Sequence, residues 1–123
     1  MRWLILITAM AGLSPPAPSI HGFMDSAALI ATCKAEDAAA PTKTAVCLGY
    51  IAGVMDQLML EQSDLQPEAR TICPPPALTV NAAKAAVLRR DGWAVTSRPV
   101  GAAGFVKAAF EDAFPCGRTV SGS

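Results

Sequence analysis

The sequence predicts an all-α fold, a small disulfide-stapled bundle of about four helices after a cleaved signal peptide. The chain has 123 residues, enough for one small domain. Its apolar residues recur at spacings of three and four, and no stretch alternates as a strand does. Four widely spaced cysteines in a small exported chain predict two disulfides.

Residues 1–22 have the layout of a secretory signal peptide. Arg2 supplies a positive tip, Trp3 to Leu13 form an uncharged apolar run, and prolines and small residues follow. The run is shorter than the roughly 20 residues that cross a bilayer. An uncleaved anchor and the N-terminal helix of a soluble protein are the alternatives. We expect cleavage near Ser19 to Gly22, a mature domain of residues 23–123, and no membrane association after cleavage.

The mature chain carries almost no net charge. Loss of the leader removes Arg2 and the only histidine, His21, and leaves nine basic residues against ten acidic ones. Such a balance gives no electrostatic attraction for nucleic acid or an anionic membrane. The sequence contains no Ser/His/Asp set, phosphate loop or cysteine pair typical of a metal site. We therefore expect a binding protein, with no enzymatic activity, no metal and no cofactor.

Two helices are predicted in the first half of the mature chain. The first spans about Met24 to Cys33, and Asp25 or Ser26 can cap its start. The second spans about Thr42 to Glu61 and begins after Pro41, a residue tolerated in the first turn. Its apolar face comprises Cys47, Tyr50, Ile51, Val54, Met55 and Leu58.

Gly49 and Gly53 interrupt this second helix. Each glycine costs about 1 kcal/mol relative to alanine in a helix interior. A close approach by another backbone or a bulky side chain would explain both, so we predict that these glycines and Tyr50 are helix-packing positions. A transmembrane dimer face is excluded because the charge-free run, 45–55, is too short to span a bilayer.

Two more helices are predicted in the second half. A polar, proline-containing stretch over 61–76 ends the second helix. Thr79 can cap a third helix that runs to about Asp91. The last helix spans about Val100 to Phe114 and is stopped by Pro115. Its predicted buried side comprises Val106, Phe110, Ala113 and Phe114, with Phe105 as a further candidate.

The four cysteines allow three pairings. Cys33 ends one predicted helix and Cys47 begins the next, so an antiparallel helix pair would bring them together. Cys73 and Cys116 both lie in proline-flanked backbone outside the helices. We therefore favour Cys33–Cys47 with Cys73–Cys116.

Four segments, in order, resemble a known family. They are AALIATC (27–33), CLGYIAGVMDQL (47–58), TICPPP (71–76) and FVKAAFEDAFPC (105–116), and they contain all four cysteines. These segments are similar to those of the type VI secretion amidase immunity (Tai-like) proteins of Gram-negative bacteria. The resemblance implies a small periplasmic helical protein, in some cases a homodimer. It also implies that the protein binds and blocks a peptidoglycan amidase effector and so prevents self-lysis.

The segment between the second and third helices is the candidate contact with the effector. A rigid loop laid across the groove of a Cys/His amidase would exclude its substrate. The alternative is an ordinary solvated turn. The predicted contact residues are Gln62, Ser63, Asp64, Gln66, Glu68 and Arg70.

The alternative function, of a different class, is that of a periplasmic acid-stress or chaperone-type helical binding protein. Such a protein would bind many unfolded clients at low pH. The chain has only ten acidic residues, which speaks mildly against a role that relies on many titrating groups.

Overall fold

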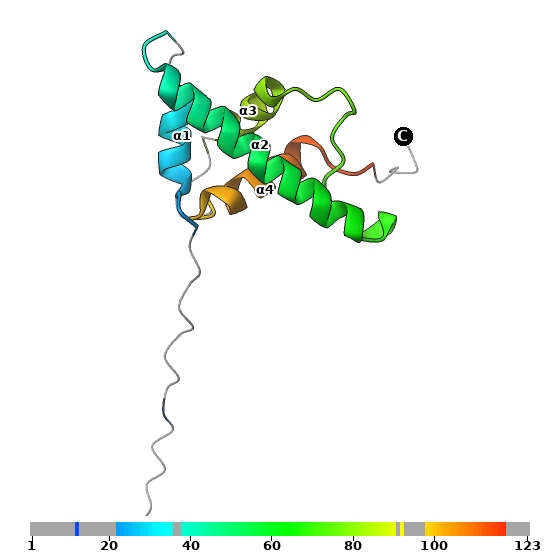
Figure 1. The fold of residues 1–123 in the computed structure, drawn as a ribbon. Coiled ribbons are helices and arrows are strands. Elements are labelled where there is room, and N and C mark those ends of the chain that lie inside the picture. The colour runs from blue at the N-terminus through cyan, green and yellow to red at the C-terminus, as the bar shows by residue number, and fades with distance from the viewer. Residues whose placement is uncertain (1–11, 13–21, 36–37, 91, 93–97, 118–123) are drawn as a thin grey trace, which may run out of the picture.

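The computed structural model describes residues 12, 22–35, 38–90, 92 and 98–117. These residues form four α-helices and one short 3-10 helix, which confirms the all-α prediction. Figure 1 shows α2 lying across the other three helices, with its C-terminal end extending beyond them. Except for Gly12 and Gly22, the predicted signal peptide lies outside the described residues. The elements are α1 (Ser26–Lys34), α2 (Pro41–Asp64), η1 (Pro67–Ala69), α3 (Val80–Leu88) and α4 (Ala102–Ala113).

Side-chain caps fix the starts of α1 and α3. The Asp25 carboxylate accepts a hydrogen bond from the Ala28 amide at 2.7 Å. The Thr79 hydroxyl accepts one from the Ala82 amide at 3.1 Å. Each bond satisfies an N–H that has no partner within the helix, and both caps agree with the sequence prediction.

Two helix ends differ from the prediction. α2 continues past Glu61 to Asp64 and stops three residues before Pro67, which disfavours helical backbone in the residue preceding it. α3 ends at Leu88 and does not reach Asp91. There the Arg90 amide bonds the carbonyl of Val87 at 3.1 Å, a tighter turn that ends the regular helix.

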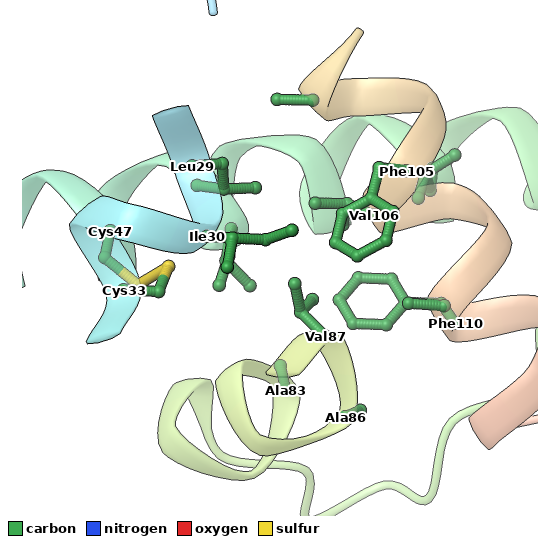
Figure 2. Close-up of a cluster of buried hydrophobic side chains, with 14 of the residues drawn as sticks. Leu29, Ile30, Cys33, Cys47, Ala83, Ala86, Val87, Phe105, Val106 and Phe110 are labelled. Atoms are coloured by element: carbon green, nitrogen blue, oxygen red, sulfur yellow. A yellow bond between two sulfur atoms is a disulfide. The ribbon is translucent and has the colours of Figure 1, made fainter. Parts of the chain in front are cut away.

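All four helices contribute to one hydrophobic core. Figure 2 shows Leu29 and Ile30 of α1 facing Phe105 of α4, with Val87 of α3 beside Phe110. On α4 the wholly buried side chains are Phe105, Val106, Ala109 and Phe110, whereas the predicted Ala113 and Phe114 are only partly buried. Burial of these large side chains supplies the main driving force for packing the bundle.

The two disulfides lie in different surroundings. Cys33–Cys47 joins the last turn of α1 to α2 and is buried. Cys73–Cys116 joins the segment after η1 to the end of α4, and Cys73 is exposed. These are the pairings that the sequence favours. The first bond holds α1 against α2, and the second ties the C-terminal segment to the chain that leaves α2.

The starts of α1 and α4 are held side by side. Asp25 and Gly101 form an isolated antiparallel bridge. Beside it, the Ser26 amide donates to the Val100 carbonyl at 2.8 Å, and the Ala102 amide donates to the Met24 carbonyl at 3.0 Å. This bridge fixes the N-terminal ends of the two helices relative to each other.

Candidate partner-binding site

The predicted contact residues lie where α2 extends past the rest of the bundle (Figure 1). Ser63, Asp64, Gln66 and Glu68 are exposed, and Arg70 is half-buried. We call residues 63–70 the 63–70 loop. It comprises the last two residues of α2, the short helix η1, and the residues on either side of η1. Its exposed tip carries two carboxylates, those of Asp64 and Glu68, and one large apolar side chain, that of Leu65.

Gln62 differs from the prediction because it is buried, with a relative exposure of 6%. Its side-chain oxygen accepts hydrogen bonds from the amides of Thr71, at 2.7 Å, and Ile72, at 3.1 Å. Burial of this polar group is compensated because its acceptor binds two backbone donors. Gln62 therefore lies at the base of the 63–70 loop and is not part of its exposed surface.

Further bonds close the base of the loop. The Arg70 Nε donates to the Gln62 carbonyl at 3.0 Å, and the Leu65 amide donates to the same carbonyl at 3.1 Å. Just beyond the loop, the Cys73 amide donates to the Phe114 carbonyl at 2.8 Å, next to the Cys73–Cys116 disulfide. The two ends of the loop are thus fixed to α2 and to the end of α4. A loop held in one conformation loses less entropy on binding.

Gly49 and Gly53 do not pack closely against another part of the described chain. A Cβ added at either position would meet no atom within 4 Å outside its own stretch of helix, and both glycines are exposed. No described element presses against them, and they line a hollow between α2 and α4. The two helices leave a groove of about 560 Å³ there, which Tyr50 and Gly104 also line.

A second hollow lies between α2 and the segment that leads to α3. Its volume is about 340 Å³, and Pro74, Pro75 and Pro76 form part of its wall. We call it the proline pocket. Asp56 of α2 also lines it. The sequence gives no indication of this pocket, since its proline wall comes from a segment distant from Asp56 along the chain.

Neither a metal site nor a membrane span is found in the described part of the chain. No three His, Cys, Asp or Glu side chains gather there closely enough to bind a metal ion. None of the described helices combines the length and the hydropathy needed to cross a bilayer.

The model of the family described as Rap1a immunity proteins matches residues 25–116 of the chain. The chain belongs to this family. The matched region includes all four helices, both disulfides and the 63–70 loop. A search of curated proteins and a search of solved structures find no match.

Membership in the Rap1a immunity protein family indicates an immunity protein that binds an effector protein. The expectation of an immunity protein is thereby confirmed. The kind of effector, the cellular compartment and the oligomeric state are matters for the proposal below.

Proposed function

We propose that this chain is a periplasmic immunity protein that binds and occludes a peptidoglycan amidase delivered by type VI secretion, and so protects the cell from self-lysis. Membership in the Rap1a immunity family supports a role in effector binding. The resemblance of residues 47–58 to Tai-like proteins supports the amidase as target. The leader-like layout of residues 1–22 and the two disulfides fit an oxidising compartment such as the periplasm.

The observation that carries the mechanism is the construction of the 63–70 loop. Its tip is exposed, whereas its base is tied by the buried Gln62 and by the Cys73–Cys116 disulfide. A projecting, fixed loop can enter a substrate groove without a large entropic cost of ordering. Occlusion of the groove inhibits an enzyme by excluding its substrate, so the immunity protein needs no chemistry of its own.

The first test is whether the genome encodes a small Cys/His hydrolase next to this chain, because its absence would count against an amidase as the target. The purified hydrolase is assayed on peptidoglycan with and without the mature domain, and the affinity of the pair is measured by calorimetry. We expect Asp64→Lys and Glu68→Lys each to weaken binding by about tenfold, the scale of one well-placed polar contact. Glu111→Lys, the same charge change on α4, serves as the matched control.

Unchanged affinity in both loop variants would remove the loop from the interface. Failure of the mature domain to inhibit the hydrolase would remove the amidase as the target. The affinity of the Glu111→Lys control for the hydrolase should stay close to that of the wild type. Glu111 lies outside the loop and makes only a surface ion pair with Lys107, at 3.8 Å.

We also propose that the chain forms a homodimer through the groove lined by Gly49 and Gly53. An added Cβ at either glycine would meet no atom within 4 Å outside its own stretch of helix, so the groove leaves room for a second helix to approach closely. A bulky substitution, Gly53→Leu, is expected to shift the mature domain from dimer to monomer in light scattering. A wild-type protein that is monomeric at all concentrations would contradict this part of the proposal.

A further inference from the structure

The proline pocket has apolar walls and a single charged residue. Met55 and Ile51 of α2 form one side, and Leu78 and Val80 lie on the other, together with the three prolines. Among the residues that line it, only Asp56 is ionisable. With a volume of about 340 Å³, the pocket is at the small end of the range for ligand sites, which is about 300–1,000 Å³.

Asp56 has no partner in the described part of the chain. Its side chain makes neither a hydrogen bond nor an ion pair there, although lysine and arginine residues elsewhere on the surface are paired, such as Arg90 with Asp112. No lysine or arginine lines the pocket. A positively charged ligand group would meet no competing cation at the Asp56 carboxylate there.

Three prolines in the pocket wall supply no hydrogen-bond donors, and the Pro75 carbonyl already accepts from the Leu78 amide at 3.1 Å. The Thr79 hydroxyl already accepts from the Ala82 amide. The N-terminus of α3 adds the equivalent of about half a positive charge, which is less than the full negative charge of Asp56. The charge at the pocket is therefore negative on balance, and a positively charged ligand group fits it.

We propose that the proline pocket takes an arginine side chain of the effector; the source of the arginine rests on the function proposed above. The aliphatic part of an arginine packs against prolines and Met55, while its guanidinium pairs with the Asp56 carboxylate. The pocket would thus be a second contact, on a different part of α2 from the 63–70 loop. It would add affinity and fix the orientation of the partner.

The first experiment tests the chemistry of the pocket without the effector. The mature domain is titrated with Nα-acetyl-arginine amide and, as the neutral analogue of the same shape, Nα-acetyl-citrulline amide, while amide shifts are followed by NMR. We expect shifts at Asp56, Thr79 and Val80, with binding of the arginine compound at least about fivefold tighter, as for a modest ion pair. Asp56→Asn abolishes this preference, and Glu111→Gln, an acid on α4 outside the pocket, preserves it.

Equal binding of the two compounds, no binding of either, or an unchanged preference in Asp56→Asn would each overturn the inference. The inference is supported if the preference for the arginine compound over the citrulline compound is lost in Asp56→Asn and kept in Glu111→Gln. Because Asp56 is exposed, its substitution leaves the core intact, and thermal unfolding of the variant verifies this.

The second experiment uses the hydrolase and separates this inference from the proposed function. Asp56→Asn is expected to lower affinity for the hydrolase by about tenfold, as loss of a charged contact does. If the hydrolase binds both proteins equally, the pocket inference fails and the immunity function stands. If the arginine compound binds the pocket but the hydrolase does not bind the chain, the proposed function fails and the chemistry of the pocket stands.

Discussion

Substitution of Gln62 by methionine tests the idea that this residue holds the base of the 63–70 loop. Methionine has nearly the shape of glutamine, so the change removes the acceptor without opening a cavity. The same substitution at Gln57 is the matched control. Gln57 lies on the same helix, but it is exposed and its side chain bonds only Glu61, at 3.3 Å.

The expected cost follows from the two amides that lose their acceptor. The Ile72 amide belongs to a buried residue, so its desolvated N–H costs about 1–3 kcal/mol when unpaired. Thr71 is exposed, so water can partly replace its bond, and the loss there is about 0.5–1.5 kcal/mol. The sum is about 1.5–4.5 kcal/mol, a large part of a total stability of about 5–15 kcal/mol.

The assay is urea unfolding of the oxidised mature domain, with hydrogen exchange at Thr71 and Ile72 as a local measure. Gln62→Met should lower the free energy of unfolding by the amount derived above and speed exchange at both amides. Gln57→Met should stay within about 0.5 kcal/mol of the wild type. If the two variants unfold at the same urea concentration, Gln62 does not hold the loop, and its burial is incidental.

Three further tests address other features. Gly53→Ala should raise the free energy of unfolding by up to about 1 kcal/mol, since the added Cβ meets no atom within 4 Å; a loss in a monomeric sample would contradict this. Phe110→Ala should cost about 3–5 kcal/mol in urea unfolding, and Phe23→Ala, at a fully exposed site, almost nothing. Cys73→Ser with Cys116→Ser should cost about 4 kcal/mol by the loop-entropy model for a separation of 43 residues; unchanged thermal unfolding would refute it.

The helices could be predicted because their determinants are local. Asp25 and Thr79 cap α1 and α3 as expected, since a cap needs only a short polar side chain three residues before an amide. The pairing of Cys33 with Cys47 also follows from a local feature, a short connection between two helices. Helix ends were less accurate: the extension of α2 to Asp64 depends on the distant contacts of Gln62, which no periodicity encodes.

The surface features depend on tertiary packing, and the sequence could not supply them. Gly49 and Gly53 suggested a close contact, but the same glycines are equally compatible with an open groove, and only the path of α4 decides between the two. Gln62 looked like its polar neighbours along the chain. Its burial arises because residues 71–72 fold back onto the end of α2 and present two amides to it.

The 63–70 loop separates the residues that stabilise it from the residues that can contact a partner. Gln62 and the Cys73–Cys116 disulfide hold its base, whereas Asp64, Gln66 and Glu68 are exposed and their side chains make no bond within the described part of the chain. Substitutions at such exposed sites usually change stability by less than about 0.5 kcal/mol. The tip can therefore vary to match a different effector while the fold keeps its stability. A fixed base with a freely variable tip is what an immunity family needs if its members face different partners.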